Sequence, residues 1–371
     1  MKKIITGAVL LLLVAVFLVA CSSATTDVNV GVGIDSADVD TYSKEGEGGE
    51  GTVAIADDVT YDAYNLLTGE YDMASDLVGK RPIAVSVNNI SVSWPQYGIS
   101  SADIVYEIET EGGITRLMCV FSDIRRVEKV GSVRSLRDQF MQCVYPFDTV
   151  IVHIGKSVYA KKYISMYNYQ TIDADVVTSV FFTDQARRAS GYAQEHTKFT
   201  SGAAIYAAID ELNFETEAYN EDPAFNFLQP GETFVPTTGV ANTVNYKFSS
   251  YYDGDFRYDE STGLYYKWQH GDRHMDAANN EQLAFENLFI VLAPIKVIDD
   301  AGCVEVNYEA GGTAYYISEG HYEELHWTKG AWSSNFTFTS VATGEELQVN
   351  PGKTHFAVIR TDYANSISFG E

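Results

Sequence analysis

Residues 102–121, with the sequence ADIVYEIETEGGITRLMCVF, contain the clearest structural signal in the chain. Two runs rich in apolar and β-branched residues, 103–109 and 114–121, flank the short segment Glu111-Gly112-Gly113. Strand-forming residues on both sides of a glycine-containing turn are typical of an antiparallel hairpin. We therefore predict two adjacent strands here, the second of them buried around Cys119.

The residues around this hairpin predict a mixed α/β domain. Residues 82–87 and 149–154 are apolar runs of strand length. Residues 135–144 and 157–167 have helical spacing, and Thr200-Ser201 can cap a further helix. We place this domain at residues 65–215.

After residue 215 the helical signal disappears. A linker at 216–241 contains Pro223, Pro230 and Pro236, and short strands separated by turns then continue to the end of the chain. We predict these strands at 243–250, 255–258, 264–270, 287–297, 303–308, 313–318, 335–338 and 354–359. Short strands at this spacing favour a sandwich or a barrel. The predicted fold class is α+β, with the mixed domain followed by a predominantly antiparallel β domain at 242–371.

The start of the chain has the pattern of an export signal. Lys2 and Lys3 precede an apolar run (4–20), and Cys21 follows Val-Ala. A charged start and a short apolar core are typical of a secretory signal, and the cysteine indicates a bacterial lipoprotein that carries its lipid on Cys21. The alternative is an uncleaved membrane anchor, but the run is short for a span of ~20 residues and no cationic cluster follows it. We predict a signal peptide at 1–20 and a lipid anchor on the extracytoplasmic face of the cell membrane.

Charge and composition narrow the possible partners. The chain has 371 residues and a net charge of -26, so its surface repels nucleic acid and anionic lipid headgroups. Residues 21–64 are acidic and rich in glycine, which predicts a flexible tether. Cys119, Cys143 and Cys303 remain once Cys21 carries lipid; they fit small core residues, although a Cys119–Cys143 bridge is also possible in an exported protein.

One segment is basic in this acidic chain. Arg134 and Arg137 flank Ser135 at a predicted helix start, where guanidinium groups and free backbone N–H groups suit a phosphate or carboxylate. Lys156 follows the strand that contains His153 and could assist. The alternative is that these bases pair with the abundant acids of the chain. The segment comprises Arg116, Arg125, Arg126, Lys129, Arg134 and Arg137.

Other chemical signals are weaker. Strand alternation places His274 and Asp276 on one face, but two ligands make an incomplete metal site and a surface His–Asp hydrogen bond is the alternative. We found no acylating or zinc-protease motif, and we predict no cofactor. The 25 tyrosines could present rings for sugars or peptides, or fill half-buried strand positions.

Several motifs together carry a family resemblance. They include 65–69, 81–85, 102–108, 111–116, 130–135, 152–155 and 196–201 in the first half, and His274-x-Asp276, Asn287, 327–329 and 351–354 in the second. With these motifs the sequence resembles the YerB-like lipoproteins, a family of unknown function. The resemblance implies a two-domain exported lipoprotein, and it marks Glu111, Arg116, Arg134, His153 and His196 as candidates for one cleft.

Two functions follow as expectations. The first is a non-catalytic envelope protein that binds a cell-wall glycan, a peptide or a protein partner near the membrane. The alternative is an envelope enzyme or receptor that handles a phosphorylated lipid or wall polymer through an arginine-lined anion site. For either function the candidate ligand-binding residues are Glu111, Arg116, Arg134, Arg137, His153, Lys156 and His196.

Overall fold

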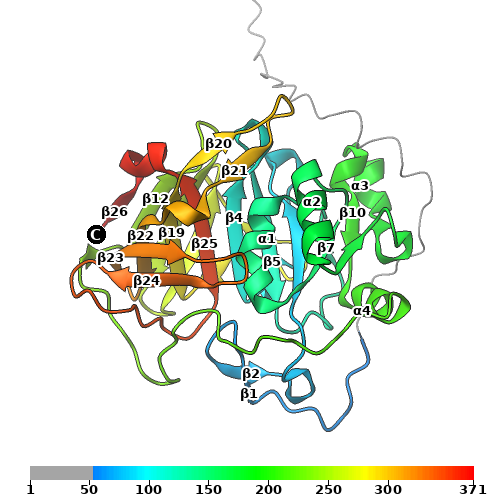
Figure 1. Cartoon of the computed structure of the whole chain (residues 1–371), viewed down its shortest axis with the longest axis horizontal. Helices are drawn as coiled ribbons and strands as arrows, with labels where there is room; N and C mark the ends of the chain where they lie inside the picture. The colour runs from blue at the N-terminus through cyan, green and yellow to red at the C-terminus, as the bar shows by residue number, and fades with distance from the viewer. Residues whose placement is uncertain (1–52) are drawn as a thin grey trace, which may run out of the picture. The chain divides into compact units, whose positions relative to one another are not determined.

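A mixed sheet of eleven strands runs through the computed structural model, which describes residues 53–371 (Figure 1). The predicted signal peptide and Cys21 lie outside the described residues. Ten strands form a continuous order, and β24 (Phe336–Ser340) also pairs with β23. The order is β11 (Gly239–Val240), β23 (His321–Lys329), β22 (Gly312–Ser318), β19 (Asn287–Ala293), β25 (Thr354–Arg360), β4 (Ile104–Glu109), β5 (Thr115–Phe121), β3 (Ile83–Asn88), β7 (Val150–His153) and β8 (Thr171–Asp173).

The predicted hairpin lies near the middle of this sheet. β4 and β5 pair antiparallel, with Ile104 opposite Val120 and Glu109 opposite Thr115. The turn between them contains Gly112 and Gly113, both at positive φ, a backbone conformation that other residues rarely adopt. The sequence prediction for this segment is therefore confirmed.

The two halves of the chain meet inside the sheet. β25, from the end of the chain, lies parallel between β19 and β4, with Phe356 opposite Tyr106. Backbone hydrogen bonds thus join the predicted first and second domains edge to edge. Strands 250 residues apart in the sequence form neighbouring rows of one core.

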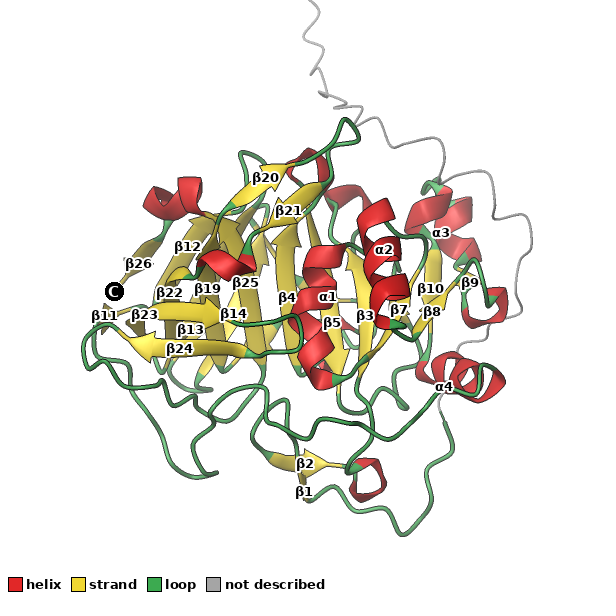
Figure 2. Cartoon of the chain, in the orientation of Figure 1, coloured by secondary structure: helices red, strands yellow, loops and turns green. Residues whose placement is uncertain are grey.

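Four α-helices accompany the sheets in residues 53–371, and α1 and α2 cross one face of the central sheet (Figure 2). The Ser157 hydroxyl accepts a hydrogen bond from the backbone N–H of Ala160, and Ser201 does the same for Ala204, so each serine caps a helix. The helices are α1 (Asp138–Val144), α2 (Val158–Tyr167), α3 (Gln185–Ala189) and α4 (Gly202–Glu211).

A second sheet of six strands packs against the other face of the central sheet. Its side chains, such as Val244 and Phe256, share one buried cluster with Val105 and Leu117 of the hairpin. The mixed domain followed by antiparallel β structure is confirmed as the fold class, and the sandwich forms between this sheet and the central one. The second sheet contains β15 (Asp272–Arg273), β14 (Leu264–Gln269), β13 (Asp253–Asp259), β12 (Thr243–Lys247), β26 (Ser368–Gly370) and β18 (Ala284–Phe285).

Short strand pairs complete the structure. Ala63 and Tyr64, the last residues of the predicted tether, pair as a strand, and the Val53 N–H donates to the Arg125 carbonyl. The pairs and the three-stranded ribbon are β1 (Ala63–Tyr64) with β2 (Tyr71–Met73), β16 (Met275–Asp276) with β17 (Glu281–Gln282), β20 (Ile295–Val297) with β21 (Val304–Val306), and β6 (Val130–Gly131), β10 (Lys198–Thr200) and β9 (Phe182–Thr183).

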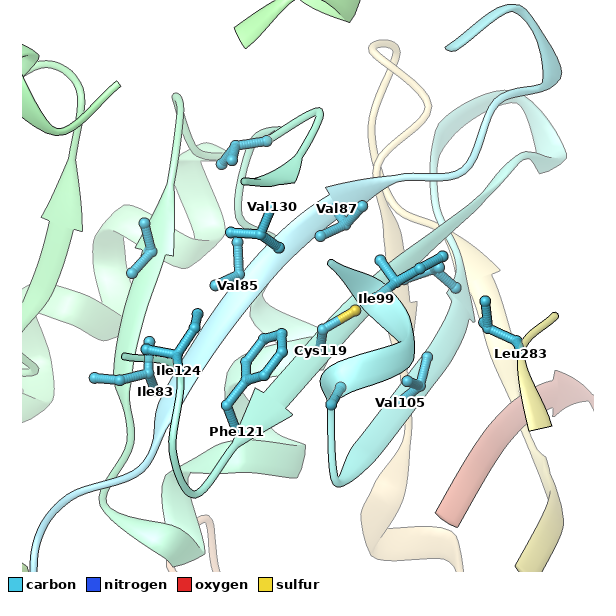
Figure 3. Close-up of a cluster of buried hydrophobic side chains, with 14 of the residues drawn as sticks. Ile83, Val85, Val87, Ile99, Val105, Cys119, Phe121, Ile124, Val130 and Leu283 are labelled. Atoms are coloured by element: carbon cyan, nitrogen blue, oxygen red, sulfur yellow. The ribbon is translucent and has the colours of Figure 1, made fainter. Parts of the chain in front are cut away.

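Side-chain alternation divides the interior into two cores. Val105, Cys119 and Phe121 point to the core beneath the second sheet, together with Ile83 (Figure 3). Their chain neighbours, such as Met118, belong to the core beneath α1 and α2. Successive strand residues point to opposite faces, so polar residues on the same strands are also sorted between two environments.

The nine-residue strand β23 has no counterpart among the predicted strands. Its inward positions are Glu323, Leu325, Trp327 and Lys329, so a charge occupies each end of the apolar row. Glu323 accepts hydrogen bonds from Thr237 and Ser340, which satisfies its carboxylate in the interior. Because both ends of this inward-facing row are charged, the sequence does not show the apolar–polar alternation that is typical of a strand.

Candidate functional site

The candidate site lies where three neighbouring parallel strands end. β3, β7 and β8 run parallel in this order, and their last residues are Asn88, His153 and Asp173. The carboxyl ends of parallel strands are the usual ligand-binding edge of an open α/β sheet. This edge carries most of the residues that the sequence singled out.

An irregular segment, residues 131–137, continues the sheet between β3 and β7 at this edge. The Arg134 N–H donates to Ser86 O at 2.9 Å, and the Ile154 N–H donates to Arg134 O at 3.2 Å. Val133 belongs to the core beneath the second sheet, so its neighbours Ser132 and Arg134 lie on the face that α1 and α2 cover. The backbone therefore fixes where this basic segment presents its side chains.

Arg116 lies on the same face, opposite Asn88 on the neighbouring strand. Its guanidinium is buried and donates to the carbonyl oxygen of Ser135. Glu111, in the hairpin turn, forms an ion pair with Arg137. Burial raises the pKa of Glu111, but Arg137 and then Arg116 outweigh it and hold that pKa below its usual value. Glu111, Arg116 and Arg137 thus form one charged group.

His153 is fully buried and held in one tautomer. Its Nδ1 lies 2.8 Å from the carbonyl oxygen of Gly155, which can only accept, so Nδ1 carries the hydrogen. Burial lowers the pKa of His153 and keeps the ring neutral. Its Nε2 is then a basic nitrogen, and it has no hydrogen-bond partner within the described part of the chain.

Lys156 is engaged with acids. Its ammonium contacts Asp173 and lies 3.5 Å from an Asp175 carboxylate oxygen. Burial lowers the pKa of Lys156, but these two carboxylates raise it above its usual value. Lys156 is therefore an internal counterion at this edge, next to the His153 ring.

His196 joins the site from a distant part of the sequence. The Asn88 side-chain amide lies 3.0 Å from His196 Nδ1, which makes that nitrogen an acceptor. Burial lowers the pKa of His196; the Glu195 carboxylate opposes this shift, and the positive charges of Arg134 and Arg187 add to it. We name this set the sheet-end cluster: Arg116, Ser132, Arg134, His153 and His196, with Glu111, Arg137 and Lys156 at its rim.

The other basic residues of the segment lie elsewhere. Arg125 pairs with Asp76 and Asp123, at 2.6 and 2.8 Å. Lys129 pairs with Asp184 at 2.6 Å, and the Arg126 guanidinium lies 4.7 Å from the centre of the Tyr61 ring. Pairing with acids, the alternative weighed for the sequence, describes Arg125 and Lys129, and it also describes Arg137, which pairs with Glu111.

Sequence reasoning missed a second polar group, on the opposite face of the sheet. The Glu107 carboxylate lies 3.0 Å from Lys267 Nζ and 3.1 Å from His355 Nε2, and all three side chains are fully buried. Thr115 and Asn89 donate to the other carboxylate oxygen at 2.7 and 3.0 Å. Lys267 and His355 come from the second half of the chain, so this group joins the two halves.

Electrostatics hold this group in one charge state. Burial raises the pKa of Glu107, but Lys267 and the hydrogen bond with His355 hold that pKa well below its usual value. Burial also lowers the pKa of His355, which leaves a neutral ring between the charges and the aromatic core. The buried pair therefore carries one negative and one positive charge.

Amide side chains extend the group. Gln269 accepts from Lys267 at 2.9 Å and from Asn89 at 3.2 Å, while Gln96 donates to Asn89 at 2.9 Å. We name the set Glu107, Lys267, His355, Asn89, Thr115, Gln269 and Gln96 the buried network. Its one sequence signal is polar residues at inward strand positions, such as Glu107 two residues after Val105.

His274 and Asp276 both contact the loop at 96–100. His274 Nε2 lies 3.1 Å from the Gln96 amide oxygen, and Asp276 accepts backbone N–H hydrogen bonds from Gly98 and Ser100. Asp276 therefore fixes a loop. The described residues contain no group of three or more His, Cys, Asp or Glu side chains that could hold a metal ion.

The three described cysteines, Cys119, Cys143 and Cys303, are free and buried. The Cys143 thiol lies 3.3 Å from the Tyr308 hydroxyl. Burial raises the pKa of Cys143 to about 12 and also raises that of Cys119, so both are protonated thiols at neutral pH.

Both halves of the chain contribute strands to one mixed sheet, which carries the sheet-end cluster on one face and the buried network on the other. The protein therefore has a two-domain architecture. Two models of the DUF3048 family, described as a protein of unknown function, match this chain. The model of the N-terminal domain matches residues 67–215, and the model of the C-terminal domain matches residues 243–356. The chain belongs to this family.

A curated relative and a solved structure agree with this assignment. The chain is 30% identical over 301 residues to "Putative lipoprotein YerB" of Bacillus subtilis (strain 168), covering 79% of this chain and 85% of the relative. It is also similar to the crystal structure of the Bacillus subtilis YerB protein, with a TM-score of 0.70 and 27% identity over 83% of this chain and 99% of that one. The resemblance inferred from the motifs is confirmed.

In residues 53–371, none of the helices is long and apolar enough to cross a lipid bilayer.

Proposed function

We propose that this chain is a lipid-anchored protein of the bacterial envelope, and that its folded body is a non-catalytic receptor for an anionic group on an envelope ligand. The ligand group is a phosphate or a carboxylate, carried by a lipid headgroup or by a wall polymer. The pattern at residues 1–21 supports the anchor, as does the name of the relative, "Putative lipoprotein YerB".

The convergence of two arginines at one sheet end carries the proposal. Arg116 and Arg134 lie on the same face at the carboxyl ends of β3 and β7, with His196 beside them. Ser132 Oγ in this region is buried and has no hydrogen-bond partner among the described residues, as is true of His153 Nε2. Buried polar atoms without partners are costly, so such atoms in one region suggest that a ligand completes them.

The same geometry supports a receptor over an enzyme. A nucleophilic mechanism needs a hydroxyl or thiol within hydrogen-bond reach of its base. His153 Nε2, the basic nitrogen of the sheet-end cluster, has no such group within hydrogen-bond distance in residues 53–371. Arg137 and Lys156 are already neutralised by Glu111 and Asp173.

Lipidation is tested by metabolic labelling. Wild-type chain and the Cys21→Ala variant are expressed in a bacterium with a lipoprotein pathway that is fed a labelled fatty acid. The wild type is expected to carry the label and the variant to carry none, because the acyl chains that give stable anchoring are attached through Cys21. Equal labelling of Cys21→Ala would contradict the lipid anchor on Cys21.

Anion binding is tested by calorimetry on the full chain in neutral detergent, with inorganic pyrophosphate as the probe. Arg134→Ala is expected to weaken binding about tenfold to a hundredfold, because a hydrogen bond to a charged group is worth ~1.5–3 kcal/mol. The control is Arg126→Ala, in the same basic segment but exposed and stacked near Tyr61. Equal binding by both variants would contradict the proposed site, and turnover of a phosphate ester would contradict a non-catalytic role.

A further inference from the structure

Strand register arranges the sheet-end cluster in two neighbouring rows. The Asn88 N–H donates to Ser132 O, and Asn88 is opposite Arg116, so these three residues lie side by side across the sheet. In the next row, the N–H of the residue after His153 donates to Arg134 O, which places Arg134 beside His153. Rows two residues apart are separated by about 7 Å along the strands, so one small oxyanion can lie between them.

The histidine tautomers decide which ring nitrogens of the cluster donate and which accept. His153 Nδ1 donates to Gly155 O at 2.8 Å, so its Nε2 carries a lone pair and can only accept. Asn88 Oδ1 accepts from the Ile90 N–H, so the amide nitrogen of Asn88 faces His196 and donates to its Nδ1. His196 Nε2 therefore carries a hydrogen and is a donor.

The cluster thus combines several donors with one unmatched ring acceptor. Arg116 and Arg134 can only donate, and the Ser132 hydroxyl, which is 0% exposed, can donate or accept. The His153 ring is also 0% exposed, and its Nε2 has no hydrogen-bond partner within residues 53–371. A carboxylate or a phosphate diester would satisfy the donors but would leave this buried acceptor unmatched, which weakens binding.

The charges around His153 favour a neutral O–H as the group that donates to Nε2. Burial lowers the pKa of His153 and outweighs the carboxylates of Asp173 and Asp175, which raise it; Lys156 lowers it as well. The ring is therefore neutral before a ligand binds. Arg134 adds a positive charge in the neighbouring segment, and like charges repel, so an ammonium is disfavoured at this position.

We propose that the sheet-end cluster binds a phosphate monoester as its hydrogen-phosphate monoanion, with the phosphate O–H donating to His153 Nε2. This inference rests on the proposed anion receptor and narrows its ligand class. Arg134 and the Nε2–H of His196 donate to the oxyanion oxygens, and the Ser132 hydroxyl completes the site. The phosphate belongs to a lipid headgroup or to an envelope sugar, and both sources carry the same terminal group.

Binding in this form takes up a proton above neutral pH. The second pKa of a phosphate monoester is about 6, so free methyl phosphate at pH 8 is almost entirely a dianion. The bound ester holds one hydrogen between its oxygen and His153 Nε2, so one proton enters from the buffer for each ligand bound. The affinity for methyl phosphate should therefore fall about tenfold per pH unit above pH 7.

The test is calorimetry on the full chain in neutral detergent, with methyl phosphate as the probe, in buffers of different ionisation enthalpy. The wild type is expected to take up close to one proton per ligand at pH 8. His153→Phe keeps a ring but removes the acceptor, so it should lose this uptake and bind about tenfold more weakly at pH 7. The control is Arg126→Ala, outside the cluster, which should keep both the uptake and the affinity.

A second probe needs no variant and so does not depend on how His153→Phe folds. Methyl sulfate has the shape and the single charge of hydrogen methyl phosphate but carries no O–H. It leaves His153 Nε2 unmatched, so the wild type should bind it about tenfold more weakly than methyl phosphate at pH 7. Its affinity should not change between pH 7 and pH 8.

The outcomes separate this inference from the receptor on which it rests. Methyl phosphate binding without proton uptake, or with an affinity that rises with pH, would overturn the hydrogen-phosphate form and leave the anion receptor in place. Proton uptake that persists in His153→Phe would overturn it too, because the hydrogen would then lie elsewhere. Absence of binding by methyl phosphate, methyl sulfate and pyrophosphate alike would overturn the receptor itself.

Two further probes distinguish the sources of the phosphate. Dihexanoyl phosphatidic acid carries a terminal phosphate on a lipid, and glucose 1-phosphate carries it on a sugar. Tighter binding of one of them assigns the source, and proton uptake with either supports the hydrogen-phosphate class.

Discussion

The two faces of the central sheet each carry a polar cluster, and the clusters differ in where their charges are paired. In the buried network, Glu107 is matched by Lys267 and His355 and by hydrogen bonds from Thr115 and Asn89. In the sheet-end cluster, paired charges lie at the rim while buried atoms at Ser132 and His153 have no partner in residues 53–371.

This difference separates a structural role from a binding role. The buried network pairs the charges of Glu107 and Lys267 in the interior, and a matched buried pair stabilises one packing of the two halves. His355 Nδ1 and Gln269 Nε2 of the same network have no hydrogen-bond partner in residues 53–371. Unsatisfied buried atoms at a sheet edge lower the stability of the unliganded protein, and a ligand that bonds to these atoms can restore that stability. The variants below test whether the two faces divide in this way.

The largest expected effect is on the buried network. Lys267→Met leaves the Glu107 carboxylate buried without its cation, and breaking a buried pair in this way costs ~3–5 kcal/mol. The measurement is urea unfolding of the variant and the wild type, followed by tryptophan fluorescence. The loss should appear in the free energy of unfolding.

The control is the exposed ion pair of Lys296 and Glu305, whose nitrogen and oxygen are 2.7 Å apart. Lys296→Met should cost less than about 1 kcal/mol, because water and salt screen exposed pairs. The double variant Glu107→Gln/Lys267→Met should recover part of the single-variant loss, since no buried charge remains. Equal losses for Lys267→Met and Lys296→Met would contradict the structural role of the buried network.

The second expected effect is a dependence of stability on pH. Burial keeps the pKa of His355 in the folded protein below its unfolded value of about 6.5, so the unfolded chain binds the additional proton. Stability therefore falls as the pH drops below about 6.5, by at most ~1.4 kcal/mol per pH unit for this group. His355→Gln should remove that contribution to the slope.

Unfolding free energies measured between pH 7 and pH 5 check this prediction. His326→Gln, at an exposed position on β23, is the matched control and should keep the wild-type slope. A His355→Gln variant with an unchanged slope would mean that His355 is already protonated beside Glu107 in the folded protein.

The smallest expected effect is on the sheet-end cluster. Ser132→Ala removes a buried hydroxyl without a partner, so stability should stay unchanged or rise slightly. Thr115→Val, on the other face, removes the hydroxyl that donates to Glu107 and should cost ~1–3 kcal/mol. Thermal unfolding of both variants gives the comparison, and a larger loss for Ser132→Ala than for Thr115→Val would reverse the roles assigned to the two faces.

Much of the fold could be predicted because alternation and capping are local. The hairpin of β4 and β5, the helix α2 and the serine that caps α4 were all found from neighbouring residues. β23 was missed because Glu323 and Lys329 occupy inward positions, where a sequence pattern expects apolar residues. Their partners are carbonyl oxygens, hydroxyls and backbone N–H groups that lie close only after folding.

The candidate site was predictable in part for the same reason. A basic segment in an acidic chain is visible in the sequence, and it led to Arg116 and Arg134. The buried network left one weak signal, polar residues at inward strand positions, and Glu107 alone looks like any polar residue in a strand. Its meaning depends on Lys267 and His355, which lie 160 and 248 residues further along the chain.

The sequence by itself determined the local elements, the excess of acid, the lipoprotein pattern at Cys21 and the basic segment that ends at Arg137. Tertiary structure alone decided that β25 pairs with β4, which of the basic residues meet at one sheet end, and that Glu107 meets Lys267. The physical reason is that side-chain period and charge belong to neighbouring residues, whereas strand register and ion-pair choice depend on contacts between distant parts of the chain.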